Sequence, residues 1–172
     1  MPKIAVNAGH CPGLDSGACG SYSQEADIVK KVAEIVCSDL NNVGYETLFI
    51  QENELEDICS MSDSFGADLF VSIHCNSAEN TSAKGTETFY CEGSSRGYRL
   101  ASKIQNQLLN ALGTIDRGLK TNRLYVTSNT AAPAALVELG FISNKEEEFM
   151  LNSRIDDMAH AIARGISDYY VC

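Results

Sequence analysis

The chain has 172 residues, of which 44% are hydrophobic, and its formal net charge at pH 7 is −10. This length is typical of one domain with a sizeable core, so residues 1–172 are expected to fold as a single domain. The acidic charge argues against a nucleic-acid partner, because phosphate binding requires a basic patch. The apolar runs are too short for membrane insertion by a helix.

The N-terminal segment and the cysteines bear on where the protein is made. The opening residues, "MPKIAVNAGH", lack the apolar core of a signal peptide and read directly as a strand. The seven cysteines are an odd number and contain no C-x-x-C pair, so neither a disulfide framework nor a zinc knuckle is indicated. Both observations favour reduced thiols and synthesis in the cytoplasm without a signal peptide.

Hydrophobic periodicity and turn residues predict alternating strands and helices along the first half of the chain. A glycine-rich loop, "NAGHCPGLDSGACGSYS", separates the first strand from the first helix. Ser21 and Gln24 have the spacing of a capping box at the start of that helix. The expected elements are a strand at Lys3–Ala8, a helix within 24–44, a strand at 45–51, a helix at Leu55–Phe65 and a strand at 69–74.

The second half of the chain continues the alternation without an internal repeat, a low-complexity tract or a linker. The expected elements are a strand at 85–91, a helix at 97–112, strands at 123–127 and 134–137, a short helix capped by Ser143 and a helix at 153–170. This order predicts an α/β fold in which helices cover a largely parallel sheet. In such sheets, ligands bind at the carboxyl ends of the strands.

Residues that can bind a metal or carry a proton fall at that edge of the predicted sheet. His10 follows the first strand, His74 ends the third and Glu138 ends the last. Glu25 lies in the first turn of the first helix, four residues before Val29, so its carboxylate extends the apolar stripe that faces the sheet. A charge that points inward without a partner is costly.

Each of these residues alone has an ordinary structural explanation: a histidine in a turn, a glutamate that favours the helix dipole, or a charge at the rim of a sheet. Their combination weakens those explanations. Two histidines and a glutamate suffice as protein ligands of a catalytic zinc, which keeps one position open for water. A second glutamate nearby is the usual proton carrier for that water. His160, by contrast, shares the polar face of the last helix with Asp156 and Arg164, and we expect it at the surface.

Several segments occur in the same order as in a known family: "NAGHCPGLDSGA", a glutamate fifteen residues after His10, "ADLFVSIHCNS", "GTETFY", "DRGLK" and "PAALVELGFISN". With these segments the chain resembles, over nearly its whole length, the zinc-dependent N-acetylmuramoyl-L-alanine amidases of the Amidase_3 group. The resemblance implies a single catalytic domain with a twisted, mostly parallel six-stranded sheet and helices on both faces. It also implies hydrolysis of the amide between N-acetylmuramic acid and L-alanine in peptidoglycan, and hence action on the cell wall.

The functional residues of that family carry over onto matching positions of this sequence. The resemblance implies that His10, Glu25 and His74 bind zinc and that Glu138, in "ELGF", is the catalytic acid and base. Asn76, two residues beyond His74, is expected to donate a hydrogen bond to the substrate or to orient its loop.

The chain departs from the family pattern outside the ligand positions. Many members carry Thr-Arg where this chain reads "FIQEN", and an arginine where it has Ile58. Between Cys75 and Leu100 there is no room for the inhibitory insertion of cell-separation members, which favours a compact lytic domain of the phage endolysin type. Two other functions stay open: a cysteine hydrolase that uses Cys11 or Cys75, and a module that binds peptidoglycan without cleaving it.

Overall fold

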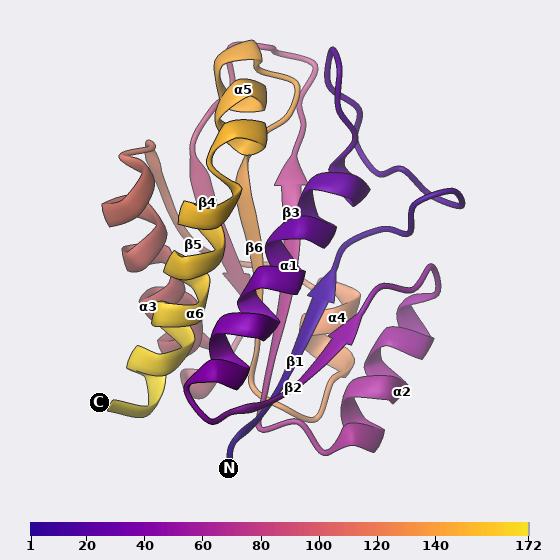
Figure 1. The fold of residues 1–172 in the computed structure, drawn as a ribbon, viewed down its shortest axis with the longest axis vertical. Coiled ribbons are helices and arrows are strands. Elements are labelled where there is room, and N and C mark those ends of the chain that lie inside the picture. The colour runs from indigo at the N-terminus through magenta and orange to yellow at the C-terminus, as the bar shows by residue number, and fades with distance from the viewer. Residues whose placement is uncertain (172) are drawn as a thin grey trace.

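The computed structural model describes residues 1–171, which form one six-stranded sheet with helices on both faces (Figure 1). The strands are β1 (Lys3–Ala8), β2 (Glu46–Ile50), β3 (Leu69–Asn76), β4 (Thr86–Tyr90), β5 (Asp116–Thr121) and β6 (Ala134–Phe141). The helices are α1 (Glu25–Asn42), α2 (Leu55–Phe65), α3 (Ser95–Leu112), α4 (Tyr125–Asn129), α5 (Lys145–Ser153) and α6 (Ile155–Val171).

The sheet is mostly parallel, as predicted, with strand order β2-β1-β3-β6-β4-β5. β1 pairs in parallel with β2 and β3, and β3 pairs in parallel with β6. β4 runs antiparallel to β6, and β5 runs parallel to β4. The carboxyl ends of β1, β3 and β6 therefore meet the amino ends of β4 and β5 at one edge, where the loop after β1 and helix α5 also lie (Figure 1).

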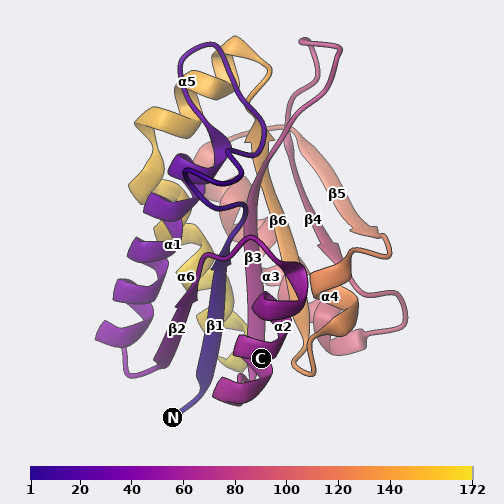
Figure 2. The same ribbon diagram turned by 90° about the vertical axis from the view of Figure 1, so that its right-hand side faces the viewer.

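Helices α1, α3 and α6 cover one face of the sheet, and α2 and α4 cover the other (Figure 2). The larger core lies under α1, α3 and α6, and a smaller one lies under α2 and α4. Each fully buried aliphatic side chain stabilises the fold by about 1.5–3 kcal/mol. Representative side chains of the two cores are Val32, Val36, Leu40, Ile104 and Ile162 in the first, and Ile58, Phe70, Val126 and Leu136 in the second.

The strand predicted at 123–127 is wrong. Tyr125–Asn129 forms helix α4, and the strand lies earlier in the chain, at Asp116–Thr121. Val126 is buried against the sheet face that α2 also covers. The β-branched and aromatic residues of this segment favour a strand, but the burial of Val126 and Thr127 on the face of the sheet outweighs that preference.

The capping box predicted at Ser21 and Gln24 is also wrong. Gln24 is the N-cap residue of α1, but no side chain caps the helix. Instead, the backbone N–H groups of Glu25 and of the next residue donate to the carbonyls of Ala18 and Ser16. The glycine-rich loop folds back over the helix start and supplies the acceptors that a capping side chain normally provides.

Three boundaries near the candidate site differ from the prediction. The N-cap of α5 is Asn144, whose side chain accepts hydrogen bonds from two backbone N–H groups, and Ser143 instead accepts from the N–H of Ala78. His74 and Glu138 lie inside their strands, because β3 and β6 each continue past them. The register between β3 and β6 shifts just after this pair, as at the β-bulges that often border functional sites.

Among residues 1–171, no helix has both the length and the apolar character needed to cross a membrane. The six cysteines of this part of the chain are free thiols. Cys172 lies outside the described residues.

Glu148 on α5 fixes the glycine-rich loop to the rest of the fold. Its carboxylate is fully buried and accepts hydrogen bonds from the backbone N–H groups of Ser21, Tyr22 and Ser23 and from the Ser23 hydroxyl. Burial opposes ionisation of this carboxyl, but the four donors outweigh burial and lower its pKa. Its contribution to stability is therefore present above the unfolded-state pKa of about 4.3 and is lost as the pH falls through the lower, folded-state value.

We predict that Glu148→Gln lowers the free energy of unfolding by about 2–4 kcal/mol at pH 7, because the amide turns an –NH₂ group toward buried N–H donors. Urea unfolding followed by circular dichroism measures this change. Glu146→Gln is the matched control, since the Glu146 side chain is 82% exposed and its ion pair with Lys84 lies at the surface. Equal stability of Glu148→Gln and the unmodified protein would contradict this role.

Candidate metal centre

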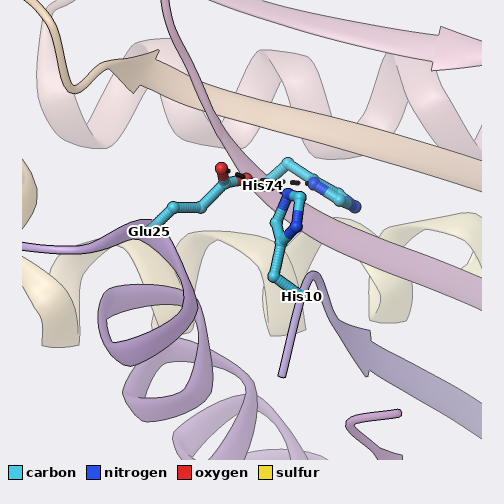
Figure 3. Close-up of side chains that lie close together, drawn as sticks. All are labelled: His10, Glu25 and His74. Atoms are coloured by element: carbon cyan, nitrogen blue, oxygen red, sulfur yellow. Dashed lines mark hydrogen bonds and ion pairs between the residues drawn. The ribbon is translucent and has the colours of Figure 1, made fainter. Parts of the chain in front are cut away.

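His10, Glu25 and His74 converge at the edge of the sheet (Figure 3). One ligand atom from each residue lies within 4.8 Å of the other two. His10 comes from the loop after β1, Glu25 is the first residue of α1, and His74 belongs to β3. Three segments that are distant in sequence thus supply a set of side chains that can hold a metal ion.

Glu25 is the buried centre of this group, with 3% of the residue exposed. Its Oε1 accepts a hydrogen bond from the N–H of Cys75 at 3.0 Å and faces Nδ1 of His74 at 3.0 Å. Its Oε2 accepts from the N–H of Ala18 at 2.9 Å and faces Nε2 of His10 at 3.3 Å. Burial opposes ionisation, but the two histidines and the backbone donor hold the pKa of Glu25 well below its usual range.

His10 reaches Glu25 because its backbone adopts a left-handed conformation, with φ of 62°. Such a conformation is uncommon for residues other than glycine and often marks a functional site. Nδ1 of His10 donates to Oδ2 of Asp15 at 2.6 Å, so Nε2 is the nitrogen directed at Glu25. The hydrogen bond to Glu25, followed by that to Asp15, raises the pKa of His10 to about 9 against the effect of burial.

A chain of hydrogen bonds fixes which nitrogen of His74 faces Glu25. The amide nitrogen of Asn7 donates to two backbone carbonyls at 3.0 and 3.3 Å, so its oxygen must accept from the Ser72 hydroxyl at 2.6 Å. Because that hydroxyl has only one proton, Ser72 Oγ accepts from Nε2–H of His74 at 3.0 Å. Nδ1 is therefore the nitrogen that His74 can offer to a metal.

Each histidine thus has one nitrogen bound to the protein and the other directed at Glu25. Polar partners of this kind orient metal-binding histidines and fix their tautomers. Sequence analysis missed these partners, Asp15, Ser72 and Asn7. Ser72 had a weak signal, because it lies two residues before His74 and so on the same face of β3.

Two glycines leave the space that the candidate ligands occupy. A Cβ on Gly9 would lie 2.3 Å from the ring of His74. A Cβ on Gly17 would lie 2.6 Å from Oε2 of Glu25 and 2.6 Å from the ring of His10, and Gly17 also has a positive φ of 64°. A side chain at either position would displace the candidate ligands.

Glu138 lies next to this group but in a different environment. It pairs with His74 across β3 and β6. Its Oε2 is buried, and within residues 1–171 that atom has no hydrogen-bond partner. Burial, and then the negative charges of Glu25 and Glu87, raise the pKa of Glu138 to about 8. A carboxyl with such a pKa can both release and take up a proton near neutral pH.

Asn76 is engaged within the protein at both ends of its amide. Its nitrogen donates to Glu87 at 2.9 Å, and its oxygen accepts from the N–H of Ser77 at 2.9 Å. These bonds favour the expected role in orienting the loop over the role of donor to a substrate.

Of the two thiols next to a histidine, that of Cys75 lacks the setting of a nucleophile. Cys75 is 3% exposed and packs in the core under α1, on the opposite side of β3 from His74. Burial, followed by the nearby charges of Glu25 and Glu138, raises the pKa of its thiol well above the usual value. Cys11 lies in the loop after His10, and its backbone, rather than its side chain, pairs with the loop. His160 is at the surface, as predicted, where it pairs with Asp39.

A cavity of about 400 Å³ opens beside His10 and His74. Its lining is mostly apolar and includes Ile58, one of the positions where the sequence departs from the family pattern. The other side chains that shape it include Asp15, Glu52, Leu55, Leu124 and Tyr125.

We predict that Ser72→Ala weakens zinc binding by about 10- to 100-fold, because the His74 ring loses the acceptor that holds its Nε2–H. Competition with a chromophoric chelator at pH 7 measures the affinity. Ser62→Ala is the matched control: Ser62 is a fully buried serine on α2 whose hydroxyl has no partner within residues 1–171. If both variants bound zinc as tightly as the unmodified protein, the hydrogen-bond chain would have no role in the site.

The whole chain is similar to known proteins of one family. A family model described as N-acetylmuramoyl-L-alanine amidase matches residues 4–168. The chain is 40% identical to the uncharacterized protein YqiI of Bacillus subtilis, over 97% of this chain and 84% of that protein. It is 35% identical to the N-acetylmuramoyl-L-alanine amidase LytC of the same organism, over 97% of this chain and 35% of LytC. The solved structure of N-acetylmuramoyl-L-alanine amidase AmiC2 of Nostoc punctiforme matches with a TM-score of 0.92 and 32% identity, over 99% of this chain and 98% of that chain. The fold and these similarities identify the chain as a member of the Amidase_3 family of N-acetylmuramoyl-L-alanine amidases.

Proposed function

We propose that the protein is a zinc-dependent hydrolase that cleaves the amide between the lactyl group of N-acetylmuramic acid and L-alanine in peptidoglycan. One observation carries the proposal beyond family membership. Glu138 has a buried carboxyl oxygen without a partner in residues 1–171, one strand away from the His10–Glu25–His74 group. A site that only bound peptidoglycan would gain nothing from such a carboxyl, whereas a hydrolase needs a proton carrier there.

The donor set fits zinc. His10 and His74 offer imidazole nitrogens, and Glu25 offers a carboxylate oxygen, which together make a three-ligand set of the kind found in catalytic zinc sites. When bound, zinc supplies a Lewis acid that polarises the amide carbonyl and makes water nucleophilic near neutral pH. Asp15 and Ser72 keep the two rings in the required orientation.

Glu138 then moves the protons of the reaction. Its ionised carboxylate takes one proton from the attacking water as the new C–O bond forms at the lactyl carbonyl. The resulting carboxylic acid gives that proton to the amine of L-alanine as the C–N bond breaks. The products are a free lactyl carboxylate and a peptide with a new amino terminus. A pKa of about 8 suits both halves of this cycle.

We predict that the purified protein binds about one zinc per chain. We also expect it to release peptides with a free N-terminal alanine from peptidoglycan and to leave the glycan strands uncut. Phenanthroline should stop the reaction, and added zinc should restore it, whereas iodoacetamide should have little effect. Mass spectrometry of the products and an amine-release assay measure these outcomes. New reducing sugar ends, or cuts inside the peptide, would contradict the assignment of the bond. Activity that survives chelation but not alkylation would favour a cysteine hydrolase.

We also predict different effects for the two glutamates. Glu25→Ala removes a ligand, so both zinc content and activity should fall. Glu138→Gln keeps the size of the side chain but removes its basic lone pair, so zinc should stay bound while turnover falls by about 10²- to 10⁴-fold. Metal analysis and the amine-release assay on the two purified variants separate these effects. Loss of zinc from Glu138→Gln would make Glu138 a ligand, and full activity of that variant would require another proton carrier.

A further inference from the structure

Glu87 on β4 is the centre of a charged cluster whose two cations have no role in the proposed reaction. The residue is 5% exposed and pairs with Glu138 across β4 and β6. Its Oε1 accepts from the Asn76 amide at 2.9 Å, and its Oε2 accepts from Nε of Arg117 at 2.8 Å and from Nζ of Lys120. Burial opposes ionisation of Glu87, but Lys120 and Arg117 outweigh it and lower the pKa, so the carboxylate is charged at pH 7.

This cluster carries more positive than negative charge, in a chain whose formal net charge is −10. The side chains of Arg117 and Lys120 are 34% and 38% exposed, so both remain accessible to a ligand. Within residues 1–171, neither cation forms an ion pair with an acidic residue other than Glu87, although the carboxyl of Glu147 is close enough to Arg117 to feel its charge. The guanidinium of Arg117 lies 4.8 Å from the centre of the Phe141 ring, which fixes its position, and only its Nε has an acceptor in the described residues. The cluster therefore has free N–H donors and an excess of positive charge.

The cluster lies at a definite distance from the metal centre. His74, Glu138 and Glu87 occupy matching positions on the adjacent strands β3, β6 and β4, and Lys120 lies on β5 beyond them. Adjacent strands are about 4.8 Å apart, so Glu87 lies about 10 Å from His74 along the sheet. An extended peptide advances about 3.5 Å per residue. If the scissile amide of a stem peptide is held at His74 and the peptide extends toward β4, its second residue lies about 7 Å farther along the sheet. That residue is then within reach of the long side chains of Arg117 and Lys120.

The charges on the two sides of the metal centre differ. The cavity beside His10 and His74 is lined by two acidic residues, Asp15 and Glu52, and by no lysine or arginine. A free carboxylate is disfavoured there and favoured on the side of Arg117. On the muramoyl side of the scissile bond, the only carboxyl group is that of the lactyl group, and it forms the amide itself, so this side of the substrate carries no charge. On the peptide side, the residue after L-alanine is D-isoglutamate, with a free α-carboxylate, or its uncharged amide, D-isoglutamine.

We propose that Arg117 and Lys120, held in place by Glu87, form a subsite for the α-carboxylate of the second stem residue of peptidoglycan. This proposal rests on the proposed amidase function. The stem peptide leaves the metal centre toward β4 and β5, and the uncharged muramoyl sugar occupies the side of the 400 Å³ cavity. The subsite makes the enzyme selective for peptidoglycan whose second stem residue is not amidated.

The test compares two disaccharide tetrapeptides that differ only in the α-carboxylate or α-carboxamide of the second stem residue. The zinc-loaded enzyme should cleave the carboxylate substrate with a kcat/KM about 10-fold higher or more, since charge-assisted hydrogen bonds are the stronger ones. Lys120→Met should lower kcat/KM for the carboxylate substrate about 10-fold more than for the amide, mainly through KM, and Lys120→Arg should keep the preference. Added salt should reduce the preference.

Lys3→Met is the matched control for charge and exposure. The Lys3 side chain is 39% exposed and pairs with Glu46 on the neighbouring strand β2, away from the cluster. This variant should leave both rates unchanged. Equal rates for the two substrates in the unmodified enzyme, or an equal loss for both in Lys120→Met, would overturn the subsite while leaving the amidase function intact. Cleavage of neither substrate would contradict the proposed function itself.

Discussion

A buried carboxylate at the start of α1 determines the arrangement of the candidate site. Glu25 is 3% exposed, and a charge so far from water must be matched by donors, or the fold loses several kilocalories per mole. Its two oxygens accept from backbone N–H groups of the loop after β1 and of β3, and each oxygen also faces one imidazole ring. The left-handed backbone of His10 and the missing side chains of Gly9 and Gly17 are consequences of bringing these donors to one point.

The site holds carboxylates in contrasting environments, and the contrast agrees with the roles proposed for them. Glu25 is surrounded by donors and stays ionised, which suits a ligand. Glu138 has a buried oxygen without a partner in the described residues, and its pKa rises to about 8, which suits a proton carrier. Glu87 is ionised by its two cations, and its charge helps to raise the pKa of Glu138. Neighbouring carboxyl groups whose surroundings shift their pKa values in opposite directions are typical of sites for acid–base catalysis.

The sequence predicted the sheet and the meeting of His10, Glu25 and His74, because strand ends of a parallel sheet share an edge and an inward-facing charge needs a partner. It did not predict the role of Ser72, whose weak signal was its place two residues before His74, since the direction of its hydrogen bond depends on Asn7 of another strand. The segment 123–127 was misassigned for a related reason. Its residues favour a strand locally, and only the packing of α4 against the sheet overrides that preference.

The position of β5 at the end of the strand order has a consequence for how such a domain can diverge. β5 pairs with β4 alone, so a change of side chain in it has few neighbours to disturb, whereas β1, β3 and β6 are packed between other strands. Arg117 and Lys120 belong to this outer strand, and the candidate metal ligands do not. The proposed subsite and the candidate metal centre therefore lie on different strands of one sheet, joined through Glu87, so that variation in the cations of β5 leaves the candidate ligands themselves unchanged.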